Sequence, residues 1–227
     1  MKISVIIPAY NEEENLGATL DAILASDYPD FEVIVSDNGS TDKTTEIARS
    51  KGVKVVREER KGTMWACEAG RKVATGEIIV RLDADCLPSK HWLSRGASYF
   101  ENPKVAAVSG PYHYFDAPKF FRHFALFSEK YIYTPASAAL SMLNIGGIII
   151  GGNSFMRASY LREIGGFDTS IVFYGDDTDV AKRLSTKGKI IFDRRLVLKT
   201  SARRFKNEGT LKIIGLYIFH FFKAMFV

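Results

Sequence analysis

The sequence predicts an α/β protein with a mostly parallel central sheet flanked by helices. Strand-like and helix-like stretches alternate through the first half of the 227 residues, which is typical of a parallel sheet with crossover helices. Polar clusters follow three of the strand-like stretches, and open parallel sheets bind ligands at such ends. The composition, 46% hydrophobic and 12% aromatic, favours a buried core over a disordered chain. Two cysteines, Cys67 and Cys86, favour a reducing compartment.

The first 110 residues supply most of the expected elements. The opening run over 3–8 is rich in β-branched residues, as in a strand covered on both faces. Asn11 followed by Glu14 resembles a capping box for a first helix, and residues 40–42 offer N-cap chemistry for a second. A third helix is expected over 62–74. Further strands are expected over 31–35, 53–56, 78–82 and 105–109.

The second half is less regular. Residues 135–152 are apolar, but glycine pairs bracket only Ile148 to Ile150, which predicts a short core strand rather than a membrane span. A helix is expected from Asp177 to Lys187, followed by strands over 189–192 and 196–200.

The C-terminal end is basic and apolar. From Lys182 onward there are 12 lysines and arginines against two acids. This end is expected either to face phosphates, of a nucleotide, a lipid headgroup or a nucleic acid, or to be a solvated basic face. Over 211–227, Lys212, His220 and Lys223 fall on one side of a helix that is otherwise apolar. A helix in the membrane interface suits this tail, and a helix docked on the protein's own core is the alternative.

Two acidic clusters carry the candidate chemistry. Asp83 and Asp85 end a buried strand, where carboxylates are costly unless a cation binds them. Mg²⁺ or Mn²⁺ is commonly held by one or two carboxylates plus phosphate oxygens. Asp176 and Asp177 stand together at a helix start, where crowding raises the pKa of a carboxyl towards values useful for a general base. The alternative for both clusters is ordinary helix N-terminal chemistry.

Five segments in this order resemble the family 2 glycosyltransferases, which have the GT-A fold. They are Val5–Glu12, Val33–Asp42, Gly76–Asp85, Gly151–Arg157 with Gly165–Asp168, and Gly175–Asp179. The resemblance covers residues 2 to about 206. It implies an inverting transfer of a sugar from a nucleotide diphosphate sugar, with Mn²⁺ or Mg²⁺.

The resemblance also implies a role for particular residues. Asp177 would be the general base that takes a proton from the acceptor hydroxyl, and Asp37 would bond the edge of the base. Asp83 would contact the ribose side and the metal, and Asp85 the metal on the diphosphate. The remaining residues implied in the nucleotide-sugar pocket are Pro8, Ala9, Tyr10, Glu12 and Ala84, and those implied on the acceptor side are Gly152, Asn153 and Asp176.

The chain departs from the family pattern at two places. The acidic pair is usually Glu-Asp, and here it is Asp176-Asp177. Where processive relatives carry Gln-x-x-Arg-Trp, this chain has Ser201-Ala202-Arg203-Arg204-Phe205, which favours a non-processive enzyme. Arg203 and Arg204 are candidates for neutralising the diphosphate, because guanidinium groups match phosphate oxygens, and surface charge is their alternative role.

The expected organisation is a GT-A glycosyltransferase domain over 1–206, with a nucleotide-binding half (1–110), an acceptor-side half (111–206) and a tail over 207–227. We expect a UDP-sugar donor, a lipid-linked or cell-envelope acceptor, and a cytoplasmic protein peripherally associated with the inner face of the membrane. A non-catalytic nucleotide-sugar-binding or membrane-recruiting protein is the alternative. A sugar nucleotidyltransferase is disfavoured because the loop after the first strand is acidic and lacks glycine. A nucleic-acid binder is disfavoured because no reading motif is present.

Overall fold

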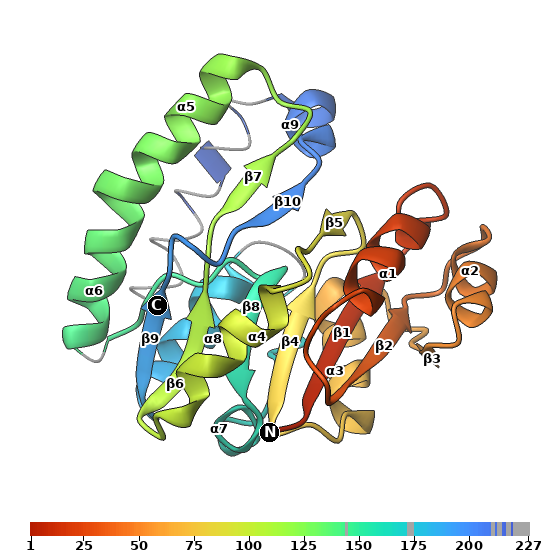
Figure 1. Cartoon of the computed structure of the whole chain (residues 1–227), viewed down its shortest axis with the longest axis horizontal. Helices are drawn as coiled ribbons and strands as arrows, with labels where there is room; N and C mark the ends of the chain where they lie inside the picture. The colour runs from red at the N-terminus through yellow and green to blue at the C-terminus, as the bar shows by residue number, and fades with distance from the viewer. Residues whose placement is uncertain (144, 172–174, 210–211, 213–214, 217–218, 220–227) are drawn as a thin grey trace.

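The computed structural model describes residues 1–143, 145–171 and 175–209, together with 212, 215, 216 and 219 (Figure 1). Within this part, seven strands form a central sheet and the predicted α/β class with a mostly parallel sheet is confirmed. The strands are β1 (Ile3–Ala9), β2 (Phe31–Asp37), β3 (Lys54–Arg57), β4 (Ile78–Leu82), β6 (Val105–Ser109), β8 (Asn153–Arg157) and β9 (Lys189–Phe192). Their order is β3-β2-β1-β4-β8-β6-β9, and β8 alone among them runs antiparallel to its neighbours.

Helices cover both faces of the sheet. Successive side chains of β1 point to opposite faces, and both sets are buried against helices. Ile3, Val5 and Ile7 pack in one apolar cluster with α1, α2 and α4, whereas Ile6 packs in a second cluster with α3, α7 and α8. These helices are α1 (Leu16–Leu24), α2 (Thr44–Ser50), α3 (Thr63–Val73), α4 (Trp92–Ser98), α7 (Ala158–Glu163) and α8 (Asp176–Ser185). A strand buried on both faces reads as a continuous apolar run, which is why β1 was recognisable in the sequence.

The parallel register brings three loops to one edge of the sheet. Ala9 at the end of β1 pairs with Asp37 at the end of β2, and β4 lies parallel on the other side of β1. The residues that follow β1, β2 and β4 therefore meet at the carboxyl edge, where doubly wound sheets bind ligands.

A second, smaller sheet stands at this edge and was not predicted. It consists of β5 (Cys86–Leu87), β10 (Leu198–Thr200) and β7 (Tyr112–Tyr114). Thr200 pairs with Cys86, next to Asp85, and so brings the end of the chain back to the acidic loop. The following helix α9 (Arg203–Glu208) begins beside that loop.

A long helical arm connects β7 to the segment before β8. It is built from α5 (Lys119–Ser128), the π-helix η2 (Glu129–Tyr133) and α6 (Thr134–Met142), and it stands at the end of the molecule opposite α2 (Figure 1). Within the described residues, no helix combines the length and apolar character needed to cross a bilayer.

Three sequence expectations need correction or lie outside the structure. The strand expected at Ile148–Ile150 is wrong, because the N–H groups of Ile148 and Ile150 donate to the hydroxyls of Ser137 and Ser109 instead of to a strand. The capping box is also wrong, because Asn11 accepts a hydrogen bond from the Thr41 N–H and no side chain caps α1. The membrane-interface helix expected over 207–227 lies largely outside the described residues.

Candidate active site

The acidic loop after β4 forms one wall of the site. Asp83 accepts a hydrogen bond of 2.8 Å from the Tyr112 hydroxyl of β7. Ala84 is buried, and its carbonyl accepts a 2.7 Å hydrogen bond from Thr19 of α1. Gly152 packs directly on this loop, since a Cβ there would lie 2.1 Å from Cγ of Asp83 and 2.2 Å from the Tyr112 hydroxyl. The position of Asp83 is thus set from two sides.

Asp85 lies deeper and beside a cation from the end of the chain. The Nε of Arg203 is 3.1 Å from Oδ2 of Asp85, and the same guanidinium pairs with Glu12 of the loop after β1. Burial, followed by the charge of Asp83, raises the pKa of Asp85, although Arg203 opposes the shift. Two carboxylates therefore share one arginine, with Asp83 close by, and this loop favours additional positive charge.

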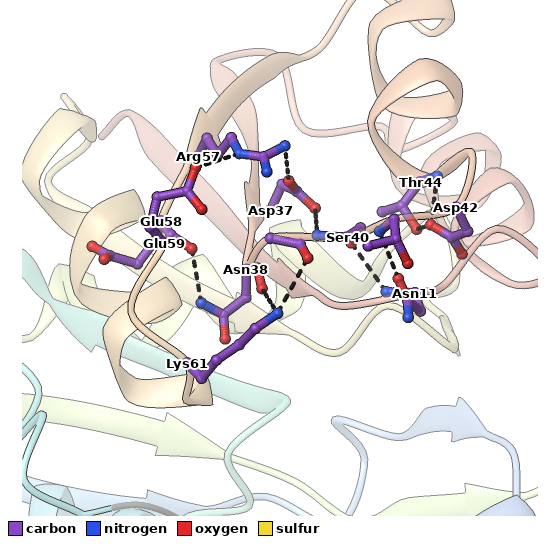
Figure 2. Close-up of polar contacts among 12 residues, drawn as sticks. Asn11, Asp37, Asn38, Ser40, Asp42, Thr44, Arg57, Glu58, Glu59 and Lys61 are labelled. Carbon is purple, nitrogen blue, oxygen red and sulfur yellow. Dashed lines mark hydrogen bonds and ion pairs between the residues drawn. The ribbon is translucent and has the colours of Figure 1, made fainter.

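The loop after β2 forms the other end of the site (Figure 2). Asp37 is fully buried; its Oδ1 accepts a 3.1 Å hydrogen bond from the Ser40 N–H, while Oδ2 has no hydrogen-bond donor and lies 3.6 Å from Arg57. Lys61 donates to the carbonyls of Asn38 and Gly39 and lies over the ring of Tyr10, 4.0 Å from its centroid. A buried carboxylate oxygen without a donor suits an N–H from a ligand.

The loops after β1 and β2 are tied together. Glu12 donates its N–H to Thr44 at 2.8 Å, and the N–H of Glu13 donates to Asp42 at 3.0 Å. Asn11 adopts a left-handed backbone with φ 52°, which turns the chain sharply away from Pro8 and Ala9. The exposed ring of Tyr10 stands on this fixed loop.

A buried arginine joins the two acidic clusters. Arg81 of β4 places NH1 2.7 Å from Oδ2 of Asp176 and 3.3 Å from Oδ1 of Asp177, at the start of α8. Its Nε is 3.8 Å from Asp83 and has no hydrogen-bond acceptor. The N–H of Gly151 donates to the other oxygen of Asp177 at 2.9 Å. The carboxylates of the two acidic clusters thus face one guanidinium.

The two adjacent aspartates have opposite proton affinities. Burial opposes ionisation of Asp176, but the charge of Arg81 lowers its pKa below the usual value. Burial, followed by the negative charge of Asp176, raises the pKa of Asp177 well above the usual range. Asp176 is accordingly the fixed counter-ion of Arg81, and Asp177 is the member of the pair suited to accept a proton.

The acidic loop also has the chemistry of a divalent-cation site. Within the described residues, no three His, Cys, Asp or Glu side chains gather to form a complete ligand set. A metal that takes one or two carboxylates and completes its shell with phosphates and water does not require such a set. Asp83 and Asp85 supply hard oxygens, and burial together with the negative charge of Asp83 raises the pKa of Asp85, a cost that a bound cation would offset. These residues fit Mg²⁺ or Mn²⁺ bound together with a diphosphate.

The structure brings most of the candidate residues to one edge of the sheet. Asn153 is different: it is fully buried, accepts a 3.0 Å hydrogen bond from the Trp92 indole, and donates to the carbonyls of Pro111 and Leu196. Both N–H groups of its amide are therefore engaged within the core. Arg204 follows Arg203 on α9 and is half-buried.

Sequence reasoning missed three residues of the site. Arg81 has a visible signal, a charge inside the otherwise apolar run Ile78–Leu82. Tyr112 and Lys61 have none, because their contacts to Asp83 and Tyr10 depend on how distant segments pack.

An acidic loop and a carboxylate pair lie at the carboxyl edge of this α/β sheet, where doubly wound sheets bind ligands. The family model for glycosyl transferase family 2 matches residues 4–165. The chain belongs to this family, and the resemblance seen in the sequence is confirmed.

Curated relatives are longer than this chain. Glycosyltransferase AglE of Haloferax volcanii is 31% identical over 184 residues, which cover 77% of this chain and 58% of AglE. A dolichyl N-acetyl-alpha-D-glucosaminyl phosphate 3-beta-D-2,3-diacetamido-2,3-dideoxy-beta-D-glucuronosyltransferase of Methanococcus voltae is 28% identical and covers 84% of this chain. The chain spans 56% of that second relative.

Solved structures share the fold. The mannosyltransferase PcManGT of Pyrobaculum calidifontis, in complex with GDP-Man and Mn²⁺, superposes with a TM-score of 0.76 at 27% identity, covering 99% of this chain and 64% of that one. Glucosyl-3-phosphoglycerate synthase of Mycobacterium tuberculosis, with Mn²⁺, UDP and phosphoglyceric acid, has a TM-score of 0.68 at 21% identity and covers all of this chain and 79% of that one. Both confirm the GT-A fold.

Proposed function

We propose that the protein is an inverting, non-processive glycosyltransferase that moves a sugar from a nucleotide diphosphate sugar to an acceptor hydroxyl. The observation that carries this proposal is that one guanidinium, that of Arg81, lies 3.8 Å from Asp83 and 3.3 Å from Asp177. In the proposal, Asp83 is the carboxylate on the diphosphate side and Asp177 is the proton acceptor. Family membership and the likeness to PcManGT support it.

In the proposed reaction, Asp177 takes the proton of the acceptor hydroxyl. The hydroxyl oxygen forms a bond to the anomeric carbon as the bond to the diphosphate oxygen breaks on the opposite face, which inverts the configuration. The nucleoside diphosphate leaves with the bonding electron pair. Gly151 and Arg81 hold the Asp177 carboxylate in position, and Asp176 keeps Arg81 paired.

Asp37, Tyr10 and Lys61 would hold the nucleobase, with Pro8, Ala9 and Glu12 lining the pocket. A divalent metal on Asp83 and Asp85 would neutralise charge on the diphosphate leaving group, and Arg203 would add a second cation. A UDP-sugar is the donor expected from the sequence, while the donor bound to PcManGT is GDP-Man. Both belong to the nucleotide diphosphate class that this site suits.

For the acceptor we propose a lipid-linked or cell-envelope glycan, used at the cytoplasmic face of a membrane. The Methanococcus voltae relative, which is named for a dolichyl N-acetyl-alpha-D-glucosaminyl phosphate, supports a lipid-linked one. Within the proposed organisation, residues 1–110 bind the donor and residues 111–206 face the acceptor. The Ser201–Phe205 segment, which lacks the Gln and Trp of processive relatives, supports transfer of one sugar at a time.

The test is release of nucleotide from a panel of UDP-, GDP- and dTDP-sugars, with Mn²⁺ and with EDTA. We expect slow, metal-dependent hydrolysis of one donor that Asp177→Asn reduces by roughly two orders of magnitude, the contribution of a positioned general base. The matched control is Asp179→Asn on the same helix, since that carboxylate pairs with Arg183 at 2.9 Å. Equal hydrolysis by both variants would remove Asp177 from the reaction.

Binding of a nucleotide sugar without turnover in the presence of lipid-linked acceptors would favour the non-catalytic alternative. Failure to bind any nucleotide sugar with metal present would contradict the whole proposal.

A further inference from the structure

The helical arm, residues 119–143, has an inner face that is anchored to the fold. The Ser137 hydroxyl accepts the Ile148 N–H at 3.1 Å, and the Ser141 hydroxyl accepts the Ile190 N–H of β9 at 3.2 Å. The ring of Tyr133 meets Phe192 edge to face at 6.2 Å. The buried side of the arm is thus defined by contacts with β9 and the segment before β8.

The outer face of the arm is apolar along its length. Exposed side chains recur every third or fourth position, as one stripe on a helix does. Of the thirteen large hydrophobic side chains exposed in the described part, seven lie on the arm. The most exposed is Met142, at 83%. A helix face in water is ordinarily polar, so this stripe is an unpartnered apolar surface.

The charge on this segment has one sign. Glu129 is the sole acid in the sequence between Asp116 and Glu163, and the structure buries it to 3% exposure beside His113. The exposed ionisable side chains of the arm, Lys119, His123 and Lys130, are basic. An apolar stripe with basic groups and no exposed acid complements a lipid surface that carries negative headgroups.

We propose that the outer face of the helical arm, carried by Leu126, Phe127, Tyr131, Ala138, Met142 and Leu143, lies in the interface of an anionic membrane. The arm leaves the fold directly after β7, which holds Asp83 through Tyr112, and returns just before Gly151, which holds Asp177. Docking by this face would bring the two segments that contact Asp83 and Asp177 close to the lipid surface. The inference rests on the proposed function only for the identity of the acceptor.

The direct test uses a fluorophore whose emission shifts to the blue in an apolar surrounding, attached through Ala138→Cys. The two native cysteines, Cys67 and Cys86, are buried, so the label is expected to react selectively with the introduced, exposed thiol. The probe vesicles are phosphatidylcholine alone and equal parts of phosphatidylcholine and phosphatidylglycerol. We expect a blue shift with the anionic vesicles that weakens as salt is raised. The same label on Leu24→Cys, at the end of α1, is expected to stay unshifted.

A matched pair of substitutions tests the energetics. Leu126 and Leu24 are both helical leucines exposed to 42%. Leu126→Asn is expected to weaken vesicle binding by roughly five- to tenfold, because part of a leucine side chain no longer enters the lipid, while Leu24→Asn leaves it unchanged. Lys130→Glu should weaken binding to anionic vesicles, and Lys43→Glu at the far end of the molecule should not.

The outcomes separate this inference from the proposed function. Vesicle binding by a protein that neither binds nor hydrolyses any nucleotide sugar would support the docking face and contradict the enzyme proposal. Equal vesicle binding by Leu126→Asn and Leu24→Asn, or an unshifted label at residue 138, would overturn the docking face. A blue shift that appears without vesicles, together with a dimer in light scattering, would assign the face to a second copy of the chain and also overturn the inference.

Discussion

Arg81 is the residue on which the two acidic clusters converge. It lies on a buried strand and faces Asp83, Asp176 and Asp177. A single guanidinium among three carboxylates is pre-organised by its planar fork, which an ammonium group cannot reproduce. The family's Glu-Asp pair is shortened here to Asp-Asp, and Arg81 contacts the shortened member at 2.7 Å.

Arg81→Lys is expected to keep the fold and nucleotide binding but to lower turnover. The substitution retains the charge yet loses the guanidinium geometry in which NH1 contacts both Asp176 and Asp177 while Nε faces Asp83. Loss of one charge-assisted contact costs about 1.5–3 kcal/mol, or ten- to a hundredfold in rate. The measurement is kcat and KM for donor hydrolysis, with Arg71→Lys as a control because Arg71 pairs with Glu68 on α3. A fall in donor affinity with unchanged kcat would contradict this role.

The pH dependence of turnover follows from Asp177. A general base acts when deprotonated, and burial together with the charge of Asp176 raises the pKa of Asp177. Turnover should therefore be full at high pH and decline as the pH is lowered through that raised pKa, well above the range of an ordinary aspartate. A profile of kcat/KM against pH checks this. An acid limb near the usual value of about 4 would contradict the assignment.

At the scale of elements, the turn before β8 contains two glycines, Gly151 and Gly152, that approach carboxylates of the candidate site. Gly152→Ala would place a Cβ 2.1 Å from Asp83, so we expect metal-dependent nucleotide binding to weaken by at least about tenfold, the effect of displacing one charge-assisted contact. Gly17→Ala is the control, since its Cβ would meet Ile47 at an ordinary 3.8 Å inside α1. That change should stabilise the helix by about 0.5–1 kcal/mol. Calorimetric titration of nucleotide and thermal melting provide both readouts.

The sequence predicts elements where periodicity is strong and local. The strands β1, β4 and β6 read as apolar runs, and α3 and α8 as helical repeats. The strand β8 was missed because Asn153 and Ser154 interrupt its apolar character. The polarity of Asn153 is explained only by its hydrogen bonds to the distant carbonyls of Pro111 and Leu196, whereas Ser154 donates to the nearby carbonyl of Gly151. The arm was missed because its apolar residues face outward as well as inward, which blurs the helical pattern.

In the candidate site, too, residues marked by a local pattern were predicted, and contacts between distant segments were not. Asp83, Asp85 and Asp177 were recognisable because carboxylates stand at the ends of predicted elements. The contact of Arg203 with Asp85 and Glu12 was not predicted, because the sequence left two roles for this arginine, a phosphate contact or surface charge. That contact joins residues almost 200 positions apart, and no local pattern encodes it.

At the scale of the whole molecule, Arg203 ties the end of the chain to its first loop. Without it, Glu12 and Asp85 share their surroundings with less compensating charge. Arg203→Gln should therefore be less stable than the parent protein without metal, and Mn²⁺ should raise its melting temperature more than that of the parent protein. Scanning fluorimetry with Mn²⁺ and with EDTA measures this, and Arg195→Gln, which loses an exposed pair with Asp193, is the control. Equal responses of the two variants would contradict the account.

The position of β8 between β4 and β6 also determines how long one edge of β4 stays unpaired while the chain is being synthesised. The strands β1 to β4 are made first and pair with one another, but the second edge of β4 finds its partner only when residues 153–157 appear. At about 5–20 residues per second, synthesis of the 75 residues from 83 to 157 lasts roughly 4–15 s. Throughout that interval the apolar edge Ile78–Leu82 is open to neighbouring nascent chains. Recombinant yield should therefore depend on translation speed between these two points more than on speed elsewhere in the message.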